Sequence, residues 1–322
     1  MISLVTGGAG FIGSHLCDYL ISKDHGVIVV DDFSTGDLDN LRSLQNSSKL
    51  TIVNGSILDK KLISDLVKKS DFCYHLAASV GVDNISRYPL KSLEINIKGS
   101  EVVLEAAADA GVKTLLASSS EIYGKNPKVP LDESSDRVLG SPEIARWSYA
   151  DAKSIDELYA FELYKNRSLP VIISRFFNTI GIRQSGSYGM VLPRFIEAAL
   201  SSQPLTVYGD GTQSRTFCSV TDVVDALVLL MDSKKSIGQA FNIGSTNEIT
   251  ITELAQKVIK LTNSSSEIVY RKHSEIFGDH FEEPQRRIPN ISKIKKIVGW
   301  QPKQSLDEVI IEIINYFKAN DA

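Results

Sequence analysis

The chain is poor in cysteine and shows no spacing typical of metal ligands. Its 322 residues include three cysteines, Cys17, Cys73 and Cys218, an odd number scattered along the sequence. This shortage excludes a small scaffold held together by disulfides and fits buried thiols in a reducing compartment. We therefore expect no metal centre and a cytoplasmic location.

Long apolar runs, basic blocks and a leader sequence are missing too. No apolar stretch approaches the roughly 20 residues that a membrane helix needs, and the net charge of −4 includes no basic block. We therefore expect neither a membrane nor nucleic acid as a partner. A strand-like run begins at residue 2, so no signal peptide is expected. A hydrophobic content of 43% and a charged content of 23% are typical of a globular protein.

A glycine-rich turn directly follows this first apolar run. Residues 6–15 read TGGAGFIGSH, and a helix-like pattern comes next. Strand, glycine turn and helix form the context that a dinucleotide pyrophosphate needs, because the glycines let the backbone approach the phosphates and the helix N-terminus offers free N–H groups. The glycines are spaced by three, unlike the commoner G-x-G-x-x-G. The expected cofactor contacts are Gly7, Gly10, Phe11, Ile12 and Gly13.

Two carboxylates lie where the cofactor's ribose would need them. Asp31 and Asp32 end a β-branched run at 27–31, about 20 residues beyond the glycines, where a carboxylate can accept hydrogen bonds from ribose hydroxyls. A carboxylate there repels a 2′-phosphate, and the next four residues include no arginine. The sequence therefore predicts NAD rather than NADP, with further contacts from Ser34, Thr35 and Gly36.

Two more strand ends are expected to meet the cofactor. Ser56 and Ile57 follow the apolar run 50–53, and Leu76, Ala77 and Ala78 come at the end of the run 72–77, where small residues let a nicotinamide pack closely. Asp59 either bonds the adenine amine or caps the next helix, and the sequence leaves both open. His75 is interpreted as a core histidine.

Strand and helix patterns alternate through the first half of the chain. Strands are predicted at 2–5, 27–31, 50–53, 72–77, 113–118 and 170–176, with helices at 13–23, 60–68, 90–110 and 149–166. This alternation predicts an α/β fold with a Rossmann-type, doubly wound parallel sheet. Residues 1–180 would form the NAD-binding domain and residues 181–322 a smaller C-terminal α+β substrate domain. The strand at 240–243 would return to the main sheet.

A tyrosine and a lysine share one face of the helix at 149–166. Tyr149 and Lys153 are four residues apart, which makes them neighbours on a helix surface. A free tyrosine has a pKa near ~10, and a nearby lysine cation favours the phenolate and lowers that pKa. Ser119, Ser120 and Glu121 follow the strand at 113–118 and would face the same cleft. These five residues are the predicted catalytic group.

Together these motifs resemble the extended short-chain dehydrogenase/reductase family, in particular its nucleotide-sugar epimerases, decarboxylases and dehydratases. The resemblance covers essentially the whole chain. It rests on TGGAGFIGSHL, HLAA, SSSEIYG, YADAK, RFFNTIG, PLTVYGDGTQSR and QRRIPNISKIKKIVGWQPK. It implies a UDP-sugar substrate and a homodimer, in which the helices at 90–110 and 149–166 would pair across a two-fold axis. The alternative is that the apolar residues on these helices belong to the ordinary core.

The resemblance also implies individual roles. Tyr149 would be the base on the sugar 4-hydroxyl, Lys153 its partner, and Ser119 would bond the same oxygen. Residues expected at the nucleotide are Asn178 and Arg215 on the diphosphate, one or both of Arg286 and Arg287 beside them, and Val191 and Leu192 near the uracil. The alternative for the arginine pair is a solvated basic pair before a helix.

The reaction depends on the fate of a 4-keto sugar. A dehydratase typically reads Thr-Asp-Glu where this chain has Ser119-Ser120-Glu121, whereas UDP-glucuronate decarboxylases read Thr-Ser-Glu and 4-epimerases usually lack the glutamate. Arg146-Trp147-Ser148 and SGSYGMVLPRF are closer to a branch with UDP-glucuronate 4-epimerases, which often carry arginine at the place of Ser187. Arg183 is a candidate substitute.

We therefore expect a 4-epimerase acting on UDP-glucuronate or a UDP-glucose type of substrate. Decarboxylation of UDP-glucuronate to UDP-xylose is the alternative. A dehydratase is less expected because Ser120 stands where dehydratases have aspartate. A non-catalytic NAD-sensing regulator on the same fold is less expected because Tyr149 and Lys153 are both present.

Overall fold

A parallel sheet lies at the centre of the molecule. The computed structural model describes residues 1–81, 88–186, 190–272, 275 and 282–320. Within these, seven strands pair in the order β11-β6-β5-β4-β1-β2-β3, all parallel. The strands are β1 Ile2–Thr6, β2 Gly26–Asp31, β3 Leu50–Asn54, β4 Phe72–His75, β5 Lys113–Ser119, β6 Val171–Phe176 and β11 Gln239–Ile243. The predicted Rossmann-type α/β fold is confirmed.

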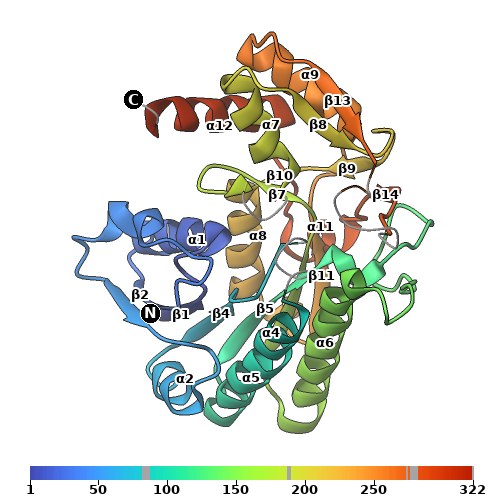
Figure 1. Cartoon of the computed structure of the whole chain (residues 1–322). Helices are drawn as coiled ribbons and strands as arrows, with labels where there is room; N and C mark the ends of the chain where they lie inside the picture. The colour runs from blue at the N-terminus through green and yellow to red at the C-terminus, as the bar shows by residue number, and fades with distance from the viewer. Residues whose placement is uncertain (82–87, 187–189, 273–274, 276–281, 321–322) are drawn as a thin grey trace.

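Helices cover both faces of this sheet (Figure 1). On one face lie α2 Lys60–Val67, α4 Pro89–Leu93, α5 Gly99–Ala110 and α6 Ser148–Arg167, and on the other α1 Phe11–Ser22, α8 Val220–Asp232 and α11 Ser292–Val298. The strands are apolar because both of their faces are buried. Leu4, for example, packs with Val103 on the first face, and Val5 packs with Leu227 on the second.

The helix predicted at 90–110 is interrupted. Between α4 and α5 the backbone forms a π-helical turn, η2 Glu94–Lys98. The buried amide of Asn96 accepts from the N–H of Ser79 at 2.8 Å and donates to its carbonyl oxygen at 3.1 Å. The wider π-helical turn therefore directs the Asn96 side chain to the segment after β4. The apolar periodicity of the sequence does not reveal this turn.

A second, smaller body lies beyond the carboxyl ends of the strands (Figure 1). It contains α7 Val191–Leu200, α9 Ile251–Thr262 and α12 Leu306–Asn320, with the short strands β7 Thr179–Ile180, β8 Leu205–Tyr208, β9 Ser214–Thr216, β10 Cys218–Ser219, β12 Glu248–Thr250, β13 Ile268–Arg271 and β14 Arg286–Arg287. Its helices share one apolar core. The chain crosses between the two bodies several times, because α8, β11 and α11 pack with the main sheet. The division at residue 180 stays a prediction.

Short 3-10 segments complete the described structure: η1 Leu38–Leu44, η3 Ser120–Tyr123, η4 Ala145–Trp147 and η6 Lys234–Ser236. Two of them, η3 and η4, carry residues of the site described below. None of the helices in the described residues is both long and apolar enough to cross a bilayer.

Candidate active site

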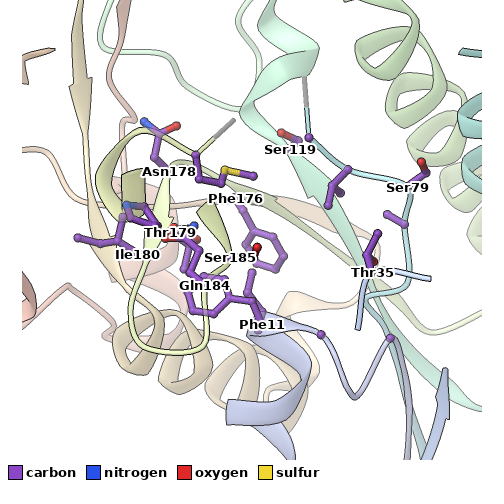
Figure 2. Close-up of a pocket in the computed structure, with 18 of the residues that line it drawn as sticks. Phe11, Thr35, Ser79, Ser119, Phe176, Asn178, Thr179, Ile180, Gln184 and Ser185 are labelled. Atoms are coloured by element: carbon purple, nitrogen blue, oxygen red, sulfur yellow. Dashed lines mark hydrogen bonds between the residues drawn. The ribbon is translucent and has the colours of Figure 1, made fainter. Parts of the chain in front are cut away.

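A cavity of about 1130 Å³ lies where the carboxyl ends of the central strands face the smaller body. This edge is where parallel α/β sheets bind their ligands. Figure 2 shows side chains around it from the start of α1 (Phe11), the loop after β2 (Thr35), the segment after β4 (Ser79), the end of β5 (Ser119) and the segment after β6 (Asn178). Segments far apart in the sequence therefore meet at one site.

The glycine turn forms one wall of the cavity. Gly7 has a φ of +71°, and a Cβ there would come within 2.8 Å of the backbone of Ala77. A Cβ on Gly13 would lie 2.2 Å from the carbonyl oxygen of Gly7. Gly10 is the N-cap of α1 and provides no side-chain cap, so the first N–H groups of the helix remain available to an anion. The turn thus lets a dinucleotide diphosphate approach the backbone closely and offers it free N–H donors.

Asp31 ties this turn to the end of β2. Its carboxylate accepts the N–H groups of Ala9 and Phe33, both at 2.9 Å. Burial raises the pKa of Asp31, and these two hydrogen bonds oppose the shift. A Cβ on Gly36 would lie 2.9 Å from both carboxylate oxygens, so the glycine keeps them accessible. Each oxygen can accept a second hydrogen bond, which fits ribose hydroxyls, while the charge opposes a 2′-phosphate.

Most of the predicted cofactor residues line the cavity. They are Gly7, Gly10, Phe11, Ile12, Gly13, Asp31, Asp32, Ser34, Thr35, Gly36, Ile57, Leu76, Ala77 and Ala78. Ser56 is not among the lining residues, because its hydroxyl accepts the N–H of Leu58 within a tight turn. Asp59 caps α2 by accepting the N–H of Leu62 at 3.0 Å. The predictions for Ser56 and for a bond from Asp59 to adenine therefore gain no support from the geometry.

Tyr149 and Lys153 both line the cavity from the first turns of α6. Lys153 is 2% exposed, and its Nζ donates to a carboxylate oxygen of Asp156 at 3.2 Å. The pKa of Tyr149 is raised by burial and by the charges of Glu121 and Asp156, and a hydrogen bond with Ser119 opposes the shift. Asp156 thus engages the ammonium of Lys153, and the expectation that Lys153 lowers the pKa of Tyr149 stays a prediction.

Glu121 forms an ion-paired cluster with two arginines. Arg146 donates to its carboxylate at 2.6 and 3.1 Å, and Arg287 donates to the same carboxylate. Burial alone would raise the pKa of Glu121, but the two guanidinium charges hold it well below its usual range. Within the part of the chain that the structure describes, the Nε and Nη2 atoms of Arg287 are buried without a hydrogen-bond partner. Arg287 also lines the cavity.

The remaining predicted substrate residues divide into two groups. Asn178, Val191, Leu192 and Arg215 line the cavity. The guanidinium of Arg215 is buried and donates to the carboxylate of Glu283. Arg286 does not line the cavity, and it pairs with Glu248 at 2.7 Å. Successive side chains of a strand point to opposite faces, so β14 directs Arg287 inward and Arg286 outward.

The sequence offered Arg183 as a partner for a sugar carboxylate, in place of the arginine that related enzymes carry at position 187. Arg183 lines the cavity, but its guanidinium pairs with Asp18 at 2.7 Å. Ser187 lies outside the described residues.

Three functional candidates were missed in the sequence. Asp156 lies three residues after Lys153 on α6, a spacing that brings side chains together on a helix and was a usable signal. Arg146 lies before α6, on η4, and pairs with Glu121 across 25 positions of sequence, so its spacing to Tyr149 gave no signal. Glu283 pairs with Arg215 across 68 positions of sequence, so no local pattern could have revealed it.

Comparison with known proteins agrees with this architecture. The family model described as GDP-mannose 4,6 dehydratase matches residues 4–313. The UDP-N-acetyl-alpha-D-glucosaminuronate decarboxylase of Bacillus cytotoxicus is 40% identical over 98% of this chain and 97% of its own length. The structure of UDP-glucose 4-epimerase from Thermotoga maritima, with UDP-glucose, superimposes with a TM-score of 0.91 at 31% identity and covers 100% of both chains.

A further solved structure has both a sugar nucleotide and a cofactor. UDP-glucuronic acid 4-epimerase from Bacillus cereus, in complex with UDP-glucuronic acid and NAD, matches with a TM-score of 0.89 and 29% identity over 99% of this chain and 100% of that one. The expectation of NAD is confirmed at the level of the family. The chain belongs to the GDP-mannose 4,6 dehydratase family, NAD-dependent nucleotide-sugar enzymes of the extended short-chain dehydrogenase/reductase type.

Proposed function

We propose that the chain is an NAD-dependent decarboxylase of a UDP-hexuronate, either UDP-N-acetylglucosaminuronate or UDP-glucuronate. The observation that carries the proposal is the position of Arg287. Arg287 lines the cavity and pairs with Glu121, and the charge of Glu121 raises the pKa of Tyr149. A sugar whose 4-hydroxyl meets Tyr149 would therefore place its next substituent, the C6 carboxylate, near a guanidinium.

The charges around this end of the cavity favour a single anionic group. Arg146 and Arg287 carry two positive charges against the one negative charge of Glu121. The cluster is therefore left with one net positive charge, which a sugar carboxylate would neutralise. A neutral hexose would leave this positive charge without a partner, which is costly in a desolvated site.

The chemistry follows from the first oxidation. Tyr149 takes the proton of the 4-hydroxyl, and Ser119 holds the same oxygen. Bound NAD supplies a reversible hydride acceptor at carbon 4. The C6 carboxylate is then β to the new carbonyl, so the C5–C6 bond breaks as carbon dioxide leaves and its electron pair moves to the carbonyl oxygen. Protonation at C5 completes the step.

Glu121 serves this step as an ion-pair partner and not as the acid. The two guanidinium groups keep its carboxylate ionised, so it has no proton to give at neutral pH. Its place between Arg146 and Arg287 instead fixes both guanidinium planes. The full-length similarity to a decarboxylase of a UDP-linked uronate supports decarboxylation as the reaction.

The sequence favoured 4-epimerisation, which remains the second candidate. The similarity to the two 4-epimerase structures supports it. Epimerisation shares the oxidation by Tyr149 but requires the 4-keto sugar to turn over in the cavity, with the C5–C6 bond intact. The two reactions differ in whether carbon dioxide is released.

A substrate panel tests the proposal. The protein is incubated with NAD and separately with UDP-N-acetylglucosaminuronate, UDP-glucuronate, UDP-N-acetylglucosamine and UDP-glucose, and the products are identified by proton NMR while carbon dioxide is assayed. We expect stoichiometric carbon dioxide from at least one uronate and a UDP-pentose or its 4-keto form. A galacto-configured product without carbon dioxide would establish the epimerase instead.

A further inference from the structure

A buried acid–base pair lies on helix α6. Lys153 and Asp156 are each 2% exposed, and the Nζ of Lys153 donates to the Oδ2 of Asp156 at 3.2 Å. The same Oδ2 accepts the hydroxyl of Ser100 at 3.0 Å. Ser100 is on α5, in the turn that follows the π-helical segment η2. Asp156 thus connects the lysine on α6 to a neighbouring helix.

The hydrogen bonds continue from Ser100 to the cavity wall in one direction. Because Ser100 gives its proton to Asp156, its oxygen accepts from the Nε2 of His75 at 3.1 Å. The Nδ1 of the neutral ring then accepts the hydroxyl of Thr6 at 2.7 Å, and the Thr6 oxygen accepts the N–H of Ala77 at 3.2 Å. Each hydroxyl gives one proton and receives one, so all the partners are satisfied.

This chain of contacts fixes the position of the lysine. It begins at Ala77, on the cavity wall, and ends at Lys153, which lines the same cavity. Every side chain between them is buried, so no ion from solvent can take the place of the Asp156 carboxylate beside Lys153. The carboxylate therefore competes with Tyr149 for the positive charge of Lys153.

We propose that Asp156 is a positioning residue that holds the Lys153 ammonium and, by sharing its charge, sets the pH at which Tyr149 acts as the base. The inference rests on the proposed function only for the role of Tyr149 in the first oxidation. The charged and polar groups around Tyr149 include Glu121 from η3, Ser119 from β5, and Lys153 and Asp156 from its own helix. Those that face Asp156 are Lys153, Ser100 and Glu157.

The decisive variant is Asp156→Asn, which keeps the shape and removes the charge. The ionisation of Tyr149 is followed by carbon-13 NMR of the NAD complex labelled at the tyrosine Cζ, without any sugar, and Tyr149→Phe assigns the signal. We expect the titration of Tyr149 to move to lower pH by about one unit, because a nearby negative charge no longer opposes the phenolate. The same titration in both proteins overturns the proposal.

Two further variants separate charge from folding. Asp151→Asn removes one negative charge from the same helix, but Asp151 is not among the groups that act on Tyr149, so its titration should stay in place. Ser100→Ala removes a donor from Asp156 and strengthens its hold on Lys153, so Tyr149 should titrate at higher pH. If Asp156→Asn does not fold, the shift of the Tyr149 titration to higher pH in Ser100→Ala becomes the test. An unchanged titration in Ser100→Ala would then count against the proposal.

The acid limb of the pH–rate profile provides an independent reading. In Asp156→Asn it should move in the same direction as the NMR titration. A shifted Tyr149 in a protein that turns over no sugar nucleotide would overturn the proposed function and keep the role of Asp156. Turnover of a sugar nucleotide together with an unchanged titration of Tyr149 would keep the proposed function and overturn the role of Asp156.

Discussion

Arg286 and Arg287 are neighbours of the same chemical type with opposite environments. Arg287 is 4% exposed and pairs with Glu121 in the cavity, whereas the side chain of Arg286 is 54% exposed and pairs with Glu248. An exposed ion pair contributes little, while a buried guanidinium with open donors is costly unless a ligand completes it. The two residues therefore form a matched pair for mutagenesis.

Replacing Arg287 with lysine should impair turnover, since lysine keeps the charge but loses the planar set of donors. We expect kcat/KM for the uronate to fall roughly 100-fold in Arg287→Lys, the cost of a hydrogen bond to a charged group. Arg286→Lys should stay within about twofold of the unaltered protein by the same steady-state assay. Equal effects of the two substitutions would contradict the assigned role of Arg287.

At this scale the sequence predicted side chains better than their partners. Tyr149, Lys153, Ser119 and Glu121 were predicted from local spacing, and all of them line the cavity. The ion pair between Glu121 and Arg287 spans 166 positions, so it depends on how the smaller body sits against the sheet. Spacing in one sequence does not contain that information, and the two arginines could not be told apart.

The glycine turn and helix α1 act together as one element. A Cβ on Gly13 would lie 2.2 Å from the carbonyl oxygen of Gly7. Neither the backbone of Gly13 nor that of Gly7 can move apart to relieve this contact without opening the turn. Gly26, at the start of β2, has its nearest neighbour at 3.5 Å from an added Cβ and has an ordinary φ. The two glycines therefore differ in how much an alanine would cost.

Gly13→Ala should weaken NAD binding at least about tenfold, because displacing the turn takes the helix N–H groups away from the diphosphate. Isothermal titration with NAD measures the change. Gly26→Ala is the control and should bind NAD like the unaltered protein. Unchanged affinity in a folded Gly13→Ala protein would show that the turn does not hold the cofactor.

The ends of helices and strands were predicted well wherever the pattern of apolar residues along the sequence is uninterrupted. The β-branched runs gave the strands of the main sheet to within a residue or two, because both faces of these strands are apolar. The helix at 90–110 was predicted as continuous, but the buried Asn96 opens it into a π turn. A polar side chain aimed at a distant backbone leaves no trace in the hydrophobic pattern.

At the scale of the whole molecule, two helices leave apolar side chains exposed. Leu90 on α4 is 81% exposed, and Ile155 and Leu158 on α6 are 47% and 62% exposed. α4 and α6 lie side by side on the same face of the sheet (Figure 1). These residues fall within the segments that the sequence assigned to pairing in a homodimer.

Leu158→Glu should shift the protein toward the monomer, because a charge at the centre of a pairing surface loses its water on association. Sedimentation velocity over a range of concentrations measures the effect. Leu229→Glu on α8 places the same charge at a leucine that is 41% exposed on the other face, and it should leave the mass unchanged. A protein that is monomeric before mutation would contradict the predicted dimer.

The buried His75 predicts how stability depends on acidity. Burial lowers the pKa of His75 to about 3, and the charge of Lys153 adds to the shift. The folded protein therefore keeps the ring neutral, while the unfolded chain takes up a proton near its ordinary pKa of about 6.5. The stability that depends on the neutral ring is complete above that pH and is lost as the pH falls toward 3.

The free energy of unfolding should therefore fall by up to about 1.4 kcal/mol per pH unit between about pH 6 and 5, before carboxylates titrate in the unfolded chain. His75→Asn removes the titrating ring and should flatten this slope, whatever it does to the absolute stability. Urea unfolding at a series of pH values gives both slopes. Parallel slopes would exclude His75 as the source.

Turnover in deuterium oxide tests the central claim, decarboxylation through a 4-keto sugar, most directly. UDP-glucuronate and UDP-N-acetylglucosaminuronate, each labelled with carbon-13 at C6, are followed by carbon and proton NMR. We predict that the label of at least one appears as carbon dioxide and bicarbonate, and that its sugar product carries one deuterium at C5. A product that retains the labelled carboxylate, with its configuration inverted at C4, would contradict decarboxylation and identify a 4-epimerase.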